Sequence, residues 1–232
     1  MTGFPRYAIY FAAGADSALS RFGAALLGYD AYTGDELPFP REALQIASDW
    51  REVSADPRKY GFHATLKAPM ALASGKTEAE LMAACAAFAG KARPVPVIRP
   101  VVDAISGFIA VIPAEPIEAL QQLAADSVRD FDAFRAPLTA EDRARRKPEK
   151  LSERQRDYLD RWGYPYVMEE FRFHMTLTGR LEVERRGPIL QMLRERFAGL
   201  QLDALTVDRI ALFRQDDARA RFRSIGEWAL AR

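Results

Sequence analysis

The sequence FHATL occupies residues 62–66, and a second copy, FHMTL, occupies residues 173–177. The chain of 232 residues contains two histidines, and both lie in these copies, as His63 and His174. In each copy bulky apolar residues occur at alternate positions, which is the period of a β-strand. The pattern therefore predicts two strands that each turn an apolar face to a core and present a histidine and a threonine on the other face.

The alternation also assigns a face to the residues around each copy. The apolar faces are predicted to hold Phe62, Ala64, Leu66, Phe171, Phe173, Met175 and Leu177. The polar faces are predicted to hold Gly61, His63, Thr65, Lys67, Arg172, His174, Thr176 and Thr178. Imidazoles, hydroxyls and cations together suit a phosphate pocket, because they donate hydrogen bonds to its oxygens and offset its charge. Lys67, Arg172 and Thr178 are therefore candidate substrate-binding residues.

Paired His-x-Thr motifs, one in each half of a chain, resemble those of the 2H phosphoesterase superfamily. The flanking sequences YGFHATLK at 60–67, GYPY at 163–166 and EEFRFH at 169–174 are similar to a narrower bacterial branch. That branch is associated with phosphonate-utilisation gene clusters. The resemblance covers most of the chain, and the two motif tetrapeptides are its function-specific part.

The resemblance implies that His63 and His174 are the catalytic pair and that Thr65 and Thr176 hold the phosphate. Tyr60 and Tyr166 lie in the flanking sequences and are further candidates for substrate binding. A single His-x-Thr motif would fit an ordinary hydrogen-bonded histidine on a sheet equally well. Two copies in matching apolar frames favour an active site.

The chemistry that two histidines offer is proton transfer. With an unperturbed pKa of about 6.5, histidine both accepts and donates protons near neutral pH. Splitting a phosphodiester needs a base for the attacking oxygen and an acid for the departing one. The residues do not say which histidine is the acid. Two histidines without a carboxylate or cysteine at ligand spacing would make a poor zinc site, so no metal and no cofactor is expected.

Composition sets broad limits. The chain is 49% hydrophobic and 28% charged, as is common for a globular domain. A net charge of +1 argues against a broad nucleic-acid-binding surface. The one cysteine, Cys85, excludes an internal disulfide and is expected to be a buried structural thiol. No apolar stretch is long enough to cross a membrane and no signal peptide is recognisable, so a cytoplasmic protein is expected.

Periodicity and turn residues predict the other elements. Strands are expected at residues 6–12, 60–67 (ending before Pro69), 95–105, 107–112, 171–181, 205–213 and 222–230. Helices are expected from a cap at Asp16 or Ser17 to Leu27, and at 41–51, 77–91, 116–131 and 188–197. A loop is expected at 28–40. Each half of the chain then consists of a motif strand, a helix and two further strands.

This order predicts an α+β protein of two similar lobes, with largely antiparallel sheets around a central cleft and helices outside. The whole chain, 1–232, would be one bilobal domain. Lobe one is expected at about 1–135 and lobe two at about 162–232. Residues 139–161, rich in alternating charge, are expected to form a solvated connector with some helix. The alternative is a basic flap, with Arg143, Arg145, Arg146 and Lys147 closing over an anionic substrate.

The function expected from these features is a metal-independent phosphoesterase acting on a small cyclic phosphate. The phosphonate association implies a sugar phosphate as substrate. One alternative is an RNA-end 2′,3′-cyclic phosphodiesterase or ligase-like enzyme, which would need a basic groove and stacking aromatics. Another is a sensor that binds a phosphorylated ligand without turning it over. The true substrate, the oligomeric state and any movement of the connector stay open.

Overall fold

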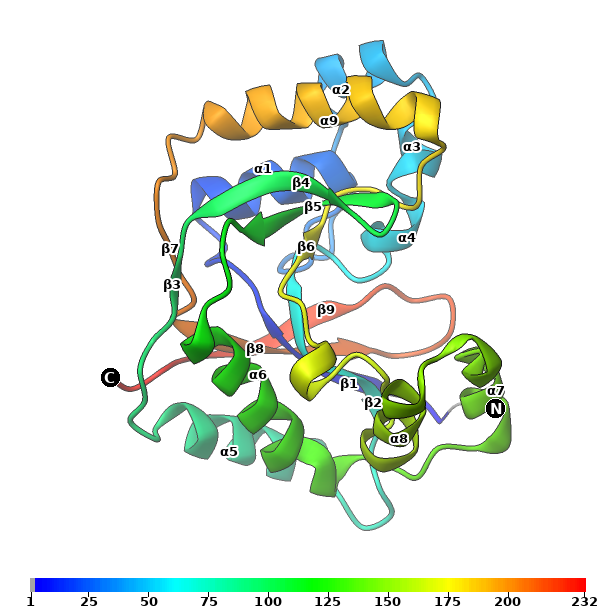
Figure 1. Ribbon diagram of the computed structural model, residues 1–232. Helices are drawn as coiled ribbons and strands as arrows, with labels where there is room; N and C mark the ends of the chain where they lie inside the picture. Colours follow the sequence, from blue (N-terminus) through cyan, green and yellow to red (C-terminus); the bar gives the residue numbers. More distant parts are fainter. Residues whose placement is uncertain (1–2) are drawn as a thin grey trace.

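The computed structural model describes residues 3–232, and its centre is a seven-stranded antiparallel sheet in the order β4-β5-β6-β2-β1-β8-β9 (Figure 1). The strands of this sheet are β1 (Arg6–Phe11), β2 (Ala64–Ala71), β4 (Pro100–Ile105), β5 (Phe108–Pro113), β6 (Met175–Thr176), β8 (Arg209–Gln215) and β9 (Arg223–Ala229). Two short strands, β3 (Val97–Ile98) and β7 (Leu205–Thr206), pair separately. The predicted α+β class with antiparallel pairing is confirmed.

The two motif strands, β2 and β6, are neighbours at the middle of the sheet. The strands that follow the first motif, β4 and β5, lie beside the second motif strand. The strands that follow the second motif, β8 and β9, lie on the other side, next to β1. The predicted order of motif strand, helix and two strands is therefore present twice, but each pair of strands is placed nearer to the other copy's motif. The lobe boundaries along the chain stay a prediction.

The helices surround this sheet (Figure 1). They are α1 (Ala18–Leu27), α2 (Arg41–Ile46), α3 (Trp50–Val53), α4 (Ala55–Arg58), α5 (Glu78–Ala89), α6 (Glu118–Phe131), α7 (Ala140–Arg145), α8 (Glu153–Trp162) and α9 (Val183–Ala198). Helix α5 packs against β8 and β9, α6 packs against β2, and α9 packs against β4. Ser17 caps α1 by accepting a hydrogen bond from the Ser20 N–H, as predicted. Thr77 and Glu80 form a capping box at the start of α5.

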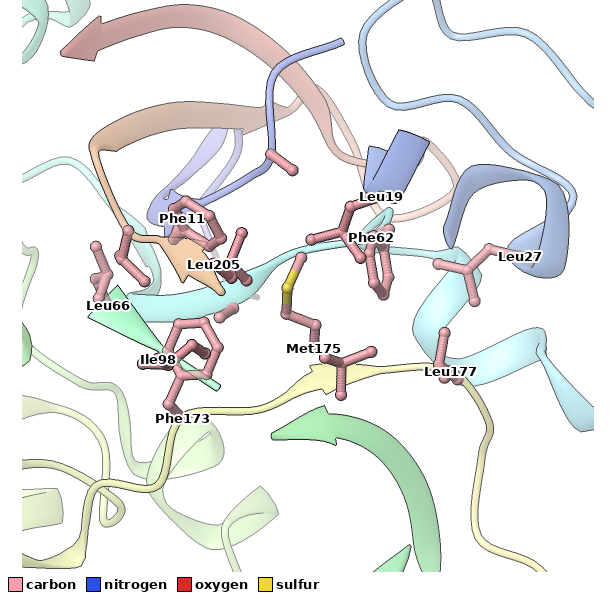
Figure 2. Close-up of a cluster of buried hydrophobic side chains, with 14 of the residues drawn as sticks. Phe11, Leu19, Leu27, Phe62, Leu66, Ile98, Phe173, Met175, Leu177 and Leu205 are labelled. Atoms are coloured by element: carbon pink, nitrogen blue, oxygen red, sulfur yellow. The ribbon is translucent and has the colours of Figure 1, made fainter. Parts of the chain in front are cut away.

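The predicted alternation along both motifs is confirmed on the apolar side. Phe62, Ala64, Leu66, Phe171, Phe173, Met175 and Leu177 are all buried in one hydrophobic core. Figure 2 shows side chains from both motifs, Phe62 and Leu66 from one and Phe173, Met175 and Leu177 from the other, in a single apolar cluster. Burial of the apolar faces leaves the opposite faces of both motifs to polar residues. Cys85 is buried, as expected, and burial raises the pKa of its thiol to about 12.

Both predicted ranges of the motif strands are wrong, since β2 covers residues 64–71 instead of 60–67 and β6 covers 175–176 instead of 171–181, and each histidine directly precedes its strand. β2 continues through Pro69 to Ala71. Its pairing with β1 has a bulge there: Tyr7 faces Met70 and Ile9 faces Lys67, so Ala68 and Pro69 both lie opposite Ala8. A proline, which has no N–H to donate, is tolerated at such a bulge. β6 is only two residues long, since the N–H groups of both Leu177 and Thr178 donate to one carbonyl, that of Ile109.

Three other predicted elements are interrupted. The strands expected at 95–105 and 205–213 each break, and their first parts pair with one another as β3 and β7 outside the main sheet. The helix expected at 41–51 is divided into α2 and α3. Helix α9 begins at Val183 rather than at Pro188, which therefore lies inside the helix. Residues 139–161 contain α7 and α8, in keeping with a connector that has some helix.

Within residues 3–232, none of the helices combines the length and the apolar character that a membrane span requires.

Candidate active site

The four motif residues meet where β2 and β6 pair. Ala64 faces Met175 across these antiparallel strands. Continuing the register by one residue in each direction places Thr65 opposite His174 and His63 opposite Thr176. Directly opposed residues on one face of a sheet have Cβ atoms about 5 Å apart. If this register continues, each histidine lies beside the threonine of the other motif, on the face that points away from the core.

The two imidazoles are oriented in the same way. Nδ1 of His63 donates to the carbonyl oxygen of Gly61 at 2.9 Å, and Nδ1 of His174 donates to that of Arg172 at 2.6 Å. In both cases the acceptor lies two residues earlier in the chain. With the proton on Nδ1, each neutral ring carries a lone pair on Nε2 that can accept a proton. Nε2 of His63 lies 3.2 Å from the hydroxyl oxygen of Thr65.

Gly61 is needed for this orientation. Its φ of +76° is in the left-handed region that favours glycine, and a Cβ there would lie 2.5 Å from that of Ala31. Its backbone can therefore turn the carbonyl oxygen toward His63 where another residue could not without strain.

Aromatic rings surround each histidine differently. The ring of Tyr10 stacks on His63 with a centroid distance of 3.7 Å and an interplanar angle of 21°. Tyr10 is fully buried, and its hydroxyl has no hydrogen-bond partner among residues 3–232. His174 has Phe108 of β5 as its aromatic neighbour, at a centroid distance of 5.5 Å. His63 is thus held by a stacked ring, and His174 by a looser contact.

Burial keeps both imidazoles neutral at neutral pH. Desolvation lowers the pKa of His63 to about 4, opposed by its hydrogen bond to Gly61 and assisted by the nearby His174. Desolvation also lowers the pKa of His174, opposed by its hydrogen bond to Arg172. An anion bound between the rings would raise both pKa values, because it stabilises the imidazolium form.

A cavity of about 390 Å³ opens beside this pair. Of the residues expected at the site from sequence, it is lined by Thr65, Arg172, His174 and Tyr166, whereas His63 and Thr176 are not among its lining residues. It is also lined by Arg180 and Tyr164, which were not among the residues predicted from sequence. Arg180 is the next residue on the predicted polar face of the second motif, so the alternation could have indicated it as a candidate. Phe108 and its neighbours reach the cavity from the β4–β5 pair, for which the sequence offered no signal.

The structure does not bring Lys67 to the cavity. Its ammonium lies 2.6 Å from the Asp132 carboxylate and donates to the carbonyl of Val128, and the side chain is 3% exposed. A second bulge is the cause, because Tyr10 faces Thr65 while Ile9 faces Lys67, so an extra residue separates the two. The strict alternation that predicted a pocket position for Lys67 is broken there.

Thr178 and Tyr60 also lie outside this cavity. Thr178 is fully buried, and its hydroxyl accepts from the Ile109 N–H at 3.0 Å and donates to the Gly179 carbonyl at 2.8 Å. The centroid of the Tyr60 ring is 6.2 Å from that of His63, and Tyr60 lines a second cavity. Among residues 3–232, no group of three His, Cys, Asp or Glu side chains is placed to hold a metal ion.

A family model described as "Protein of unknown function (DUF1045)" matches residues 65–223. This chain belongs to the DUF1045 family. Two curated relatives are both named ribose 1,5-bisphosphate phosphokinase PhnN. The protein from Janthinobacterium sp. (strain Marseille) is 36% identical over 88% of this chain and 47% of its own length. The protein from Laribacter hongkongensis (strain HLHK9) is 32% identical over 94% of this chain and 50% of its own. The chain thus spans about half the length of these relatives.

Solved structures give a more distant likeness. A crystal structure of a phosphoesterase is 19% identical, with a TM-score of 0.45, over 98% of this chain and 99% of its own. E. coli LigT complexed with 3′-AMP is 18% identical, with a TM-score of 0.44, over the same shares of the two chains. At these TM-scores the likeness supports no inference about the site.

Proposed function

We propose that this protein is a phosphoesterase that opens a small cyclic phosphate through His63 and His174, without a metal. The observation that carries the proposal is the matched orientation of the two imidazoles. Each donates Nδ1–H to the carbonyl two residues earlier, which leaves the lone pairs of both Nε2 atoms for proton transfer. A histidine that only stabilised a sheet would not need this arrangement to occur twice.

In the proposed reaction a neutral imidazole takes a proton from water as the water oxygen bonds to phosphorus. The phosphorus–oxygen bond of the ring breaks, and the other histidine, as imidazolium, gives its proton to the departing oxygen. The hydroxyls of Thr65 and Thr176 donate to the non-bridging oxygens. Arg172 and Arg180 line the cavity and offset the charge that develops there.

The substrate class is proposed from the relatives. Their printed name refers to a ribose bisphosphate, and this chain matches about half of each. A cyclic phosphate of a small sugar, in phosphonate metabolism, agrees with that name and with the flanking sequences of the motifs. The cavity of about 390 Å³ is large enough for a molecule of this size.

One observation favours a second candidate, an RNA-end cyclic phosphodiesterase. Phe108, Tyr164 and Tyr166 line the cavity, and aromatic rings stack well on nucleobases. A nucleotide substrate would use these rings, whereas a free sugar phosphate would gain little from them.

The test is turnover in the presence of EDTA. The full chain is mixed with sugar and nucleoside cyclic phosphates, beside the His63→Ala and His174→Ala variants. We expect turnover that survives EDTA and falls by about 10²–10⁴-fold in each variant, as for removal of a general acid or base. Turnover that EDTA abolishes, or that either variant retains, would contradict the mechanism. A ligand that binds but is returned unchanged would favour a sensor.

A further inference from the structure

A second cavity, of about 500 Å³, has Tyr60, a neighbour of His63, in its wall and is lined with basic residues. Its cations are Arg6, Lys59, Arg135, Arg145 and Arg146, and its single lining carboxylate is Asp142. They come from the start of β1, the residues before the first motif, the segment after α6 and the charged connector. Figure 1 shows that α7 lies near the start of β1, which brings the connector to this place.

Two of these cations already have acidic partners. Arg135 donates to Asp132 at 2.8 Å, and Arg145 is paired with Asp142. The others have no carboxylate partner within residues 3–232. Arg6 donates to the neutral amide of Gln215 at 2.9 Å.

Arg146 lies over the ring of Tyr164, 5.0 Å from its centroid. No ion pair is formed by Lys59 within the part of the chain that the structure describes. Within the described residues, Arg6, Lys59 and Arg146 therefore give the cavity positive charge that no carboxylate neutralises.

Without a bound anion, the positive charges around this cavity repel one another and are unfavourable. Burial lowers the pKa of Arg6, and the positive charges of Arg145 and Arg146 lower it further. Cations that converge on one concave surface attract a counter-ion and gain most from a ligand with more than one negative charge. Guanidinium groups and an ammonium are the usual ligands of a phosphate monoester.

The two cavities share a wall. Tyr60 lines the basic cavity, and its ring is 6.2 Å from that of His63. Pro69 and Gly163 line the basic cavity. Their chain neighbours Ala68 and Tyr164 line the active-site cavity. The two cavities are therefore neighbours.

We propose that the basic cavity binds a second phosphoryl group of the substrate, distant from the one that is cleaved. The substrate class is then a cyclic phosphate that also carries a phosphate monoester. This inference rests on the proposed function for its account of the first phosphate. It also gives part of the connector a role in binding, through Arg145 and Arg146, without requiring the connector to move.

The test compares matched substrates. Cyclic phosphates of ribose and of adenosine are offered with and without a 5-phosphate group, and kcat/KM is measured for each. We expect the 5-phosphate to raise kcat/KM by about tenfold or more, since hydrogen bonds to charged groups are the strong ones. In Arg146→Gln and Lys59→Gln this ratio should fall toward one. In the control Lys150→Gln, which removes an exposed charge outside the cavity, the ratio should stay as in the native chain.

A binding measurement separates this inference from the proposed reaction. Titration calorimetry with adenosine 2′,5′-bisphosphate and adenosine 2′-monophosphate needs no turnover. Tighter binding of the bisphosphate, weakened in Arg146→Gln, would support the second site even if no cyclic phosphate is cleaved. Turnover without any preference for the 5-phosphate, or a preference that both variants keep, would overturn the second site and leave the proposed reaction intact.

Discussion

The two motifs share a sequence and a hydrogen-bonding pattern, yet they place their histidines in different surroundings. His63 is stacked on Tyr10, and its pKa is lowered to about 4. His174 lies in the wall of the cavity beside Phe108, and its pKa is lowered with no second positive charge among the causes. From this difference in surroundings we predict that, in the proposed reaction, His63 acts as the base and His174 as the acid.

The largest expected effect tests these roles through the leaving group. His174→Ala should lose about 10²–10⁴-fold in kcat/KM on a cyclic phosphate, whose departing oxygen needs a proton. The same variant should lose far less on a phosphodiester with a p-nitrophenolate leaving group, which departs without one. His63→Ala should lose activity on both substrates. The opposite pattern would mean that His63 is the acid and His174 the base. Equal losses for both variants on both substrates would contradict separate acid and base roles.

A smaller effect is expected at the threonines. Thr65→Val and Thr176→Val should each lower kcat/KM by about 10–100-fold, because a hydrogen bond to a charged group contributes about 1.5–3 kcal/mol. Thr178→Val is the matched control, since its hydroxyl bonds only to backbone groups. That variant should lose about 1–3 kcal/mol of unfolding free energy in urea and keep its activity per folded molecule. If Thr178→Val lost activity without losing stability, Thr178 would have to be counted among the substrate-binding residues.

Thr178 and Lys67 show where prediction from the sequence stops. The alternation of apolar residues located the motif strands, their buried faces and the two histidines, because burial of one face of a strand follows a period of two. The same alternation fails beyond a bulge, and one extra residue at the end of the first motif takes Lys67 to Asp132. A bulge depends on the pairing of two strands, which a single strand's residues do not specify.

The remainder of the site depends on topology. Phe108 reaches His174 because the two strands that follow the first motif lie beside the second. Arg6, Lys59 and Arg146 are far apart in the chain, and nothing in their own segments indicates that they line one cavity. The order of elements was predictable from local patterns. Which elements become neighbours was not, since it is decided by packing over the whole chain.

The pKa of His63 is lower in the folded chain than in the unfolded chain, so the free energy of unfolding should depend on pH. The unfolded chain binds a proton at His63 near pH 6.5, whereas the folded chain does so only near pH 4. The stability that this neutral histidine contributes is present above pH 6.5 and is lost as the pH falls toward 4. Between pH 7 and pH 5 the native chain should therefore lose about 2 kcal/mol that His63→Asn does not lose. Urea unfolding at both pH values measures this, and an equal loss in both proteins would contradict the burial of His63.

The smallest expected effect concerns Tyr10, the residue that most distinguishes the two histidines. Its ring stacks on His63, but its buried hydroxyl has no hydrogen-bond partner among residues 3–232. Tyr10→Phe keeps the stack and removes an unsatisfied polar group, so the free energy of unfolding should rise by about 1 kcal/mol. Because the ring and not the hydroxyl positions His63, kcat/KM should change by less than about twofold. Tyr10→Leu, which removes the ring, should lower kcat/KM further than Tyr10→Phe. A tenfold or greater loss of kcat/KM in Tyr10→Phe would mean that the hydroxyl itself contacts the substrate. The two histidine sites would then differ in a catalytic group and not only in packing.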